Sequence, residues 1–271
     1  MRVFYMILWL CAPFFVKAQG TLAENQLDGL LLYKSEMTSW YGTDVVREKF
    51  PGALKSLGGY FSYPSGNWYS CVFYSKDAQP KVLITISFDS TYQLQEAITN
   101  TETREFTAEE LVYYKLRKAA FEQVKQDTSV HLLPNTSLNF VPLVHEGKHK
   151  VYVLSGPKEP NIVLFGNDYL LLFDDKTHIK SLTKLHKQAV PIKYDDKQPV
   201  AASLHTDTNE SDKYITATDI CTLMLYARYA GWKQHFVVSP SFVSIWDCEK
   251  DELNVITIEA WHKILEAQQQ K

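Results

Sequence analysis

The stretch that decides the fold runs from Ser203 to Cys248 and reads SLHTDTNESDKYITATDICTLMLYARYAGWKQHFVVSPSFVSIWDC. It predicts a strand whose end carries His205 and Asp207, followed by a polar loop. Residues 216–219 then open a helix that closes at Gly231, and two short strands follow. A polar pair at a strand end that faces the start of a helix is where we expect a functional site to form.

Two short motifs in this stretch carry a resemblance to a known family. His205-Thr206-Asp207 precedes Thr216-Ala217-Thr218-Asp219, and together they resemble the metal-binding half of the JAB/MPN-type zinc metalloproteases (JAMM). That family uses His-x-His and then Ser-x-x-Asp at the start of a helix. The resemblance covers about residues 200–246 and implies a zinc hydrolase of the peptidase or isopeptidase type. His205, Asp207 and Asp219 would then hold the metal, with a water in the fourth position.

The sequence departs from the family pattern at three places. Asp207 stands where the second histidine belongs, and Thr216 stands where the serine belongs. The interval from Asp207 to Asp219 is one residue longer than the usual spacing. The chain also has no upstream glutamate that is well placed to act as the general base, so the catalytic residues of such a hydrolase stay unassigned.

Helix capping offers a different explanation for Thr216 and Asp219. Their spacing is that of a capping box with Asp in place of Glu or Gln, and an acid in the first turn is favoured by the helix dipole. In this arrangement the Asp219 carboxylate bonds to the backbone N–H groups of residues 216 or 217, and His205 is a half-buried strand residue. The metal arrangement instead requires ligating atoms of His205, Asp207 and Asp219 within about 4 Å of one another.

The wider C-terminal half also resembles an uncharacterised family of secreted proteins from Bacteroidota-type bacteria. The residues that carry this resemblance are Phe165-Gly166-Asn167-Asp168-Tyr169, Lys184-Leu185-His186, Ile215-Thr216-Ala217-Thr218-Asp219-Ile220-Cys221 and Trp232-Lys233-Gln234-His235. The resemblance implies export. Residues 166–168 are also typical of a hairpin turn with positive φ.

Single histidines and cysteines give further candidates. His186, His205 and His235 all lie beside apolar segments, where a histidine is either a ligand or a satisfied structural residue. Cys221 falls early in the predicted helix, where a thiol pKa is lowered, but nothing in the sequence places a base beside it. Cys221 and Cys248 could pair in a disulfide, and the alternative is that both are buried thiols.

The N-terminus predicts export. One charge, Arg2, precedes an apolar run from Val3 to Val16, and Val16-Lys17-Ala18 fits a signal-peptide cleavage site. The alternative is an uncleaved anchor, but the run is shorter than the ~20 residues of a spanning helix. We therefore expect residues 1–18 to be a signal peptide, a periplasmic or secreted mature protein, and no transmembrane segment after cleavage.

The rest of the chain predicts an α+β fold with antiparallel sheets and flanking helices. We expect an N-terminal α+β region over 19–130, a C-terminal antiparallel-sheet α+β region over 131–271, and a linker at 195–199. The helix over 107–126 is expected to pack on the strand at 81–88. The predicted helices are 22–40, 44–49, 107–126 and one from 259 with Trp261, Ile264 and Leu265 facing inward; the predicted strands are a hairpin within 58–76, 81–88, a meander of 138–144, 150–154, 162–165 and 169–173, and 253–258; residues 176–187 are left open.

Charge, motif content and tyrosine content limit the classes of function that the sequence favours. The net charge is −3 and the basic residues are scattered, which does not favour a nucleic-acid partner. The chain contains no Gly-rich phosphate loop, Gly-x-Ser-x-Gly elbow, Cys-x-x-Cys pair or His-Glu-x-x-His helix. With 16 tyrosines suited to carbohydrate or protein contacts, we expect a non-catalytic binding or interaction protein of the cell envelope, whose partner is an envelope protein or a glycan. The alternative is the JAMM-like zinc hydrolase.

Overall fold

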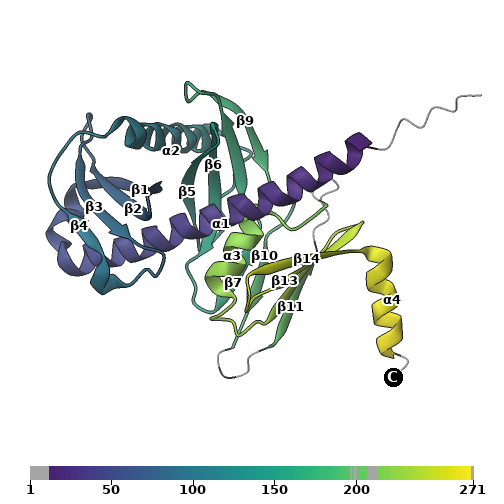
Figure 1. Cartoon of the computed structure of the whole chain (residues 1–271). Coiled ribbons are helices and arrows are strands. Elements are labelled where there is room, and N and C mark those ends of the chain that lie inside the picture. Colours follow the sequence, from purple (N-terminus) through teal and green to yellow (C-terminus); the bar gives the residue numbers. More distant parts are fainter. Residues whose placement is uncertain (1–11, 196, 198–199, 207–212, 270–271) are drawn as a thin grey trace, which may run out of the picture.

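One long helix, α1 (Ala12–Lys49), crosses the molecule and packs against elements from both halves of the chain (Figure 1). The computed structural model describes residues 12–195, 197, 200–206 and 213–269, with only the backbone of 12–21 and 269. The helix joins the two predicted segments 22–40 and 44–49. Gly42 does not break this helix. A Cβ at this position would lie 3.0 Å from Cys71 Cβ, so the glycine allows α1 to approach the sheet closely.

The buried face of α1 is unusually polar. Asp28, Glu36 and Ser39 are buried, whereas Leu27 and Leu30 are 38% and 37% exposed. Each of these three buried side chains has a partner far along the chain. The Ser39 hydroxyl bonds to that of Ser62 at 2.8 Å, and Asp28 and Glu36 bond to residues of the second sheet.

The N-terminal sheet has the antiparallel order β1-β2-β3-β4. Its hairpin turns at Gly66, where φ is 63°, as the sequence predicts. The α1 residues Val45 and Val46 fill the core beneath this sheet together with Phe73 and Ile86. The elements are two 3-10 turns, Pro51–Ser56 and Leu94–Glu96, and the strands β1 (Leu57–Ser65), β2 (Trp68–Ser75), β3 (Val82–Phe88) and β4 (Ile98–Asn100).

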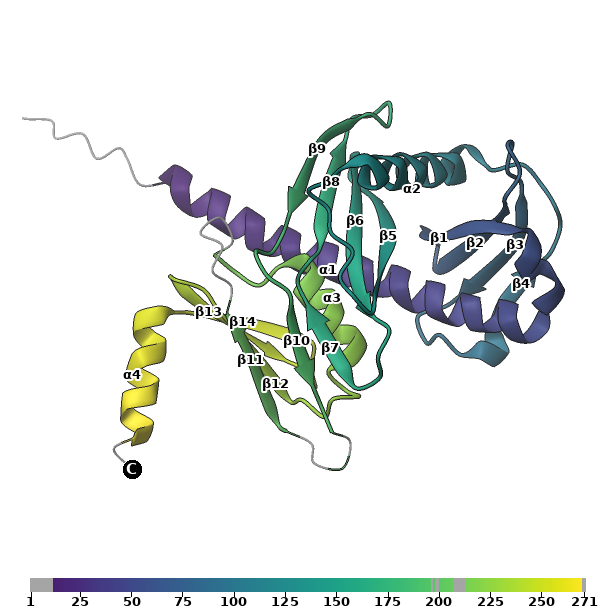
Figure 2. The same cartoon turned by 180° about the vertical axis from the view of Figure 1, so that it is seen from behind.

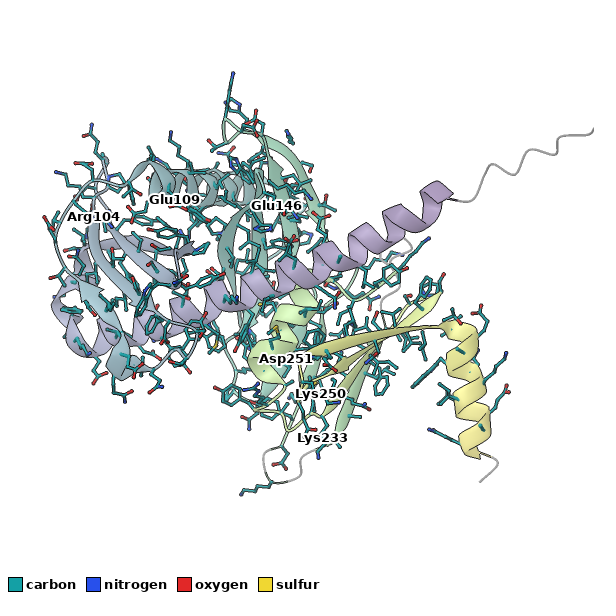
Figure 3. The ribbon with its side chains drawn as sticks, in the orientation of Figure 1. Arg104, Glu109, Glu146, Lys233, Lys250 and Asp251 are labelled. Carbon is teal, nitrogen blue, oxygen red and sulfur yellow. The ribbon has the colours of Figure 1, made fainter. Side chains whose placement is uncertain are left out.

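The helix α2 (Ala108–Gln126) confirms the capping prediction. Thr107 and Glu110 form the full capping box, and the Glu110 carboxylate also accepts 2.6 and 2.7 Å bonds from Arg104, which is labelled at the N-terminal sheet in Figure 3. The expected packing partner is wrong. Leu116 and Ala120 pack on strands of the second sheet rather than on the strand at 81–88.

The second sheet has the antiparallel order β5-β6-β8-β9. Its strands are β5 (Thr136–His145), β6 (Lys148–Pro157), β8 (Tyr169–Phe173) and β9 (Ile179–Lys184). β9 resolves the segment 176–187 that the sequence left open. A buried ion cluster fixes α1 to this sheet, because Lys150 on β6 contacts both Asp28 and Glu24, and Tyr152 donates a 2.6 Å bond to Asp28.

The meander prediction is wrong for the strand at 162–165. This strand, β7 (Ile162–Phe165), leaves the second sheet and pairs with β10 (Val190–Lys193). Residues 166–168 therefore do not form a hairpin turn, although Asn167 does have a φ of 58°. The chain is diverted because Asn167 and Asp168 are buried and bond back to β6, where the Ser155 N–H donates to Asp168 at 2.8 Å.

The stretch from Ser203 to Cys248 supplies most of a third sheet, which has the order β11-β12-β13-β14. β11 (Ala202–Thr206) runs parallel to β12 (Gln234–Val238), and α3 (Ala217–Tyr226) makes the crossover between them. β13 (Phe242–Asp247) and β14 (Glu252–Thr257) follow antiparallel. α3 ends at Tyr226, before the predicted Gly231, and the predicted linker lies largely outside the described residues. Lys233, Lys250 and Asp251 lie together over this sheet in Figure 3.

The C-terminal helix α4 (Ile258–Gln269) stands apart from the body in both views (Figures 1 and 2). Trp261 does pack, with its ring 5.3 Å from that of Phe236. Ile264 and Leu265 are 43% and 37% exposed, so the prediction that they face inward is wrong. Among the described residues, α4 contacts the sheet at β13 and β14 and through the Trp261 ring.

The α+β class is confirmed, with helices set against mainly antiparallel sheets. Among the described residues, no helix is both long and apolar enough to cross a membrane. The described cysteines, Cys71, Cys221 and Cys248, are separate buried thiols, so the Cys221–Cys248 disulfide is not formed. The signal peptide and the boundary at 130/131 stay predictions; the cleavage point after Ala18 falls within the α1 backbone.

Candidate functional site

The stretch from Ser203 to Cys248 brings three of the candidate site residues together at the start of α3. His205 lies on β11, Asp219 lies in the first turn of α3, and His235 lies on β12. His186, in the loop after β9, reaches the same place from the second sheet. Asp207 lies outside the described residues, so its position relative to the others is untested.

Asp219 combines the two roles that the sequence set against each other. Its carboxylate accepts a 3.1 Å bond from the Thr216 N–H, and the Thr216 hydroxyl accepts one from the Asp219 N–H, which completes the capping box. The same carboxylate lies 3.2 Å from His186 Nε2 and 3.9 Å from His205 Nε2. Burial alone would raise the pKa of Asp219, but His186, His205 and the Thr216 N–H hold it well below its usual range.

A chain of polar contacts runs from His205 into the sheet. His205 Nδ1 lies 2.8 Å from His235 Nε2, and His235 Nδ1 lies 2.6 Å from the Ser203 hydroxyl. The Phe165 ring stacks on both imidazoles at centroid distances of 4.6 and 4.7 Å. Burial and the neighbouring His205 lower the pKa of His235 to about 3, although Asp219 acts in the opposite direction. His235 is therefore neutral at physiological pH.

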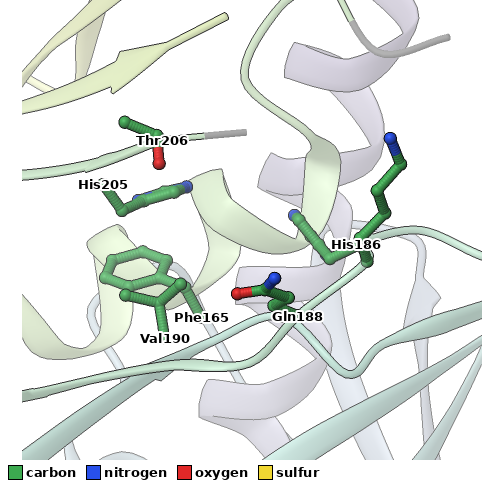
Figure 4. Close-up of a pocket in the computed structure, with 8 residues that line it drawn as sticks. Phe165, His186, Gln188, Val190, His205 and Thr206 are labelled. Carbon is green, nitrogen blue, oxygen red and sulfur yellow. The ribbon is translucent and has the colours of Figure 1, made fainter. Parts of the chain in front are cut away.

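A small pocket of about 80 Å³ opens beside this cluster. Figure 4 shows His205 and Thr206 on one side of it and His186 and Gln188 on the other, with Phe165 below. A pocket of this size holds a few water molecules or an ion. Of the three imidazoles, those of His186 and His205 line this pocket, whereas His235 is fully buried behind them.

The described part of the cluster does not make up a zinc site. Among the described residues, no group of three or more His, Cys, Asp or Glu side chains is arranged to hold a metal ion. The Asp219 carboxylate already contacts the Thr216 N–H through Oδ2 and His186 Nε2 through Oδ1. The predicted set of His205, Asp207 and Asp219 needs Asp207 as its third ligand and stays a prediction.

Comparison with known proteins adds no family. Neither protein-family models, nor curated proteins, nor solved structures gave a match to this chain.

A second and larger cavity, of about 260 Å³, lies between α1, α3 and the strands that they cover. Sequence reasoning missed it, because its walls come from six elements. Three of its walls are aromatic: Trp40 from α1, Tyr60 from β1 and Tyr226 from α3. Ser137, at its rim, is exposed, so the cavity reaches the surface there. The remaining lining residues are Glu36, Asn139, Leu154, Ser155, Gly156, Pro157, Leu164, Cys221, Thr222 and Leu225.

Glu36 is the charged group of this cavity. It is 6% exposed, and Asn139 donates a 2.7 Å bond to its Oε1. Burial raises the pKa of Glu36 to about 7, although Asn139 and the more distant Arg117 act in the opposite direction. A buried acid with a raised pKa in a cavity is typical of functional sites. The sequence does hold one signal, since Glu36 and Trp40 are one helical turn apart on α1.

Proposed function

We propose that this is an exported, non-catalytic binding protein of the cell envelope, and that its ligand occupies the cavity between α1 and α3. The observation that carries the proposal is the cavity itself, which approaches the ~300 Å³ of small-molecule pockets. Its lining mixes aromatic and aliphatic side chains with polar side chains in similar measure, so it offers both apolar contact and hydrogen-bonding groups to a ligand.

The chemistry of the lining favours binding over catalysis. Burial raises the pKa of the Cys221 thiol well above its usual range, so it is a poor nucleophile at neutral pH. Burial likewise raises the pKa of Tyr60 to about 12, which keeps its hydroxyl neutral. Burial also raises the pKa of Tyr226 well above its usual range, so Glu36 is the group of the described lining that titrates near neutral pH. In the proposed binding role, the Glu36 carboxyl group orients the ligand.

A fragment screen read by ¹H–¹⁵N NMR tests the proposal. We expect small aromatic fragments to shift amide signals of residues that line the cavity, and Thr222→Trp to abolish these shifts by filling it. Thr183→Trp, at an exposed position of β9, is the matched control, and Ser137→Phe blocks the rim if Thr222→Trp does not fold. Fragment shifts that persist in a folded blocked variant would place the site elsewhere. N-terminal mass spectrometry tests export: the mature chain begins at Gln19, and a chain that begins earlier contradicts cleavage.

The JAMM-like zinc hydrolase is the second candidate. The observation in its favour is the 3.9 Å between His205 Nε2 and Asp219 Oδ2, which meets the separation expected of two ligands to one ion. Stoichiometric zinc in protein purified without chelators would support this candidate. Failure to take up zinc after supplementation would exclude it and leave the binding function.

A further inference from the structure

Resting on the proposed function, we infer that the ligand of the cavity carries a protonated primary or secondary amine, which pairs with the Glu36 carboxylate. The inference names the class of ligand that the lining recognises. Its basis is the unequal use of the two carboxylate oxygens, the aromatic walls, and the contacts of Arg117.

The two oxygens of Glu36 are in different situations. Oε1 accepts the bond from Asn139 at 2.7 Å. Among the described residues, no hydrogen bond reaches Oε2. Oε2 is not among the fully buried polar atoms that lack a partner, so it is open to the cavity, where the N–H or O–H of a bound ligand can take the place of water. Oε2 therefore selects a ligand that carries N–H or O–H groups.

The cation whose charge lowers the pKa of Glu36, against the raising effect of burial, is Arg117, and its own contacts are with tyrosine side chains. Arg117, on α2, lies over the face of the Tyr60 ring, with its guanidinium carbon 5.6 Å from the ring centroid. It donates to the Tyr74 hydroxyl at 3.1 Å, and it forms no ion pair with Glu36 among the described residues. The charge of an ionised Glu36 is thus left for the ligand to neutralise.

The walls suit the body of an organic amine. Trp40 and Tyr226 lie edge to face, with ring centroids 5.5 Å apart, and Tyr60 completes the aromatic part of the lining. Aromatic faces attract an ammonium group and its adjacent methylenes. A quaternary ammonium would satisfy the rings but not Oε2, because it has no N–H to donate. A primary or secondary ammonium on a flat apolar body meets both requirements.

The same geometry predicts a dependence on pH. The ammonium group pairs with the ionised carboxylate, whereas Glu36 in the empty cavity is partly protonated at neutral pH, since its pKa lies at about 7. Binding below pH 7 therefore requires release of a proton, and affinity falls by tenfold per pH unit there. The other groups that face Glu36 hold one charge state over pH 5–8: Tyr60 from β1, Cys221 and Tyr226 from α3 stay neutral because burial raises each pKa, and Arg117 stays charged.

Calorimetry with benzylamine and its neutral counterpart benzyl alcohol tests the inference. At pH 8 we expect wild-type protein to bind benzylamine at least tenfold more tightly than benzyl alcohol. Glu36→Gln keeps an oxygen for Asn139 but places an amide donor at the Oε2 position. We therefore expect this variant to lose at least tenfold in benzylamine affinity and to leave benzyl alcohol affinity unchanged. Glu48→Gln, exposed on the same helix, is the matched control and should match wild type.

The pH series sharpens the result. Between pH 8 and pH 5 the benzylamine affinity of wild-type protein should fall by about 100-fold, while that of Glu36→Gln stays constant. Equal affinity for the two probes, or an unchanged Glu36→Gln, overturns the amine inference. If both probes bind equally, the cavity is still a ligand site and the proposed function stands. If neither probe binds wild-type protein, the inference is wrong, and the fragment screen decides the proposed function on its own.

Discussion

Replacing Glu36 by glutamine should stabilise the protein at alkaline pH and leave its stability unchanged at acidic pH. The pKa of Glu36 is about 7 in the folded chain, against an ordinary value of 4.5. Because the folded state holds the proton more tightly, wild-type stability is full below pH 4.5 and declines as pH rises through 7. A difference of about 2.5 between the two pKa values, at about 1.4 kcal/mol each, corresponds to about 3 kcal/mol.

Urea denaturation of wild type and Glu36→Gln at pH 4.5 and pH 8.5 measures this difference. We expect the free energies of unfolding to agree at the lower pH to within about 1 kcal/mol, and the variant to exceed wild type by about 3 kcal/mol at the higher pH. Glu48→Gln, at an exposed site, should show less than about 0.5 kcal/mol of change at either pH. If the effect of Glu36→Gln is the same at both pH values, Glu36 does not titrate near 7 and the reasoning fails.

Two further substitutions probe how α1 is held. Gly29→Ala places a Cβ 2.7 Å from Ile220 Cβ and should lower the free energy of unfolding by about 1–3 kcal/mol. The control Gly52→Ala adds a Cβ with nothing within 4 Å and should leave that free energy unchanged. Equal urea midpoints for the two variants would contradict the close approach of α1 and α3. Lys150→Met leaves the buried Asp28 without its cation and should cost about 3–5 kcal/mol. Lys148→Met, at a 59% exposed side chain, should cost less than about 1 kcal/mol, and similar losses for the two would show that the Lys150 cluster is not buried in solution.

Local chemistry allowed much of the fold to be predicted. The capping boxes at Thr107 and Thr216 locate the starts of α2 and α3 within a residue, and Gly66 marks the turn of the first hairpin. These signals depend on residues three or four apart, which the sequence displays directly. The departure of β7 from the second sheet could not be predicted, because it depends on Asp168 bonding to β6 in a distant part of the chain.

In the candidate sites too, features that depend on nearby residues could be predicted and features that depend on distant residues could not. Convergence of His205 and Asp219 followed from the strand–loop–helix pattern, and the structure places them 3.9 Å apart. His186 joins them from another sheet, 33 residues away in sequence from Asp219, and no local pattern points to it. The cavity around Glu36 was beyond prediction for the same reason, since its hydrogen-bond partner Asn139 is 103 residues distant.

The central claim is that Glu36 is a buried acid whose carboxylate binds a cationic ligand. Measuring the ionisation of its carboxyl group tests this claim most directly. A ¹³C NMR pH titration of protein labelled at glutamate side-chain carboxyl carbons, with the Glu36 signal assigned from its loss in Glu36→Gln, reports the ionisation of this residue alone. We predict a midpoint near pH 7 for the free protein and a midpoint lower by at least one pH unit with saturating benzylamine. A free-protein midpoint near the ordinary 4.5, or a midpoint that benzylamine does not move, would contradict the account.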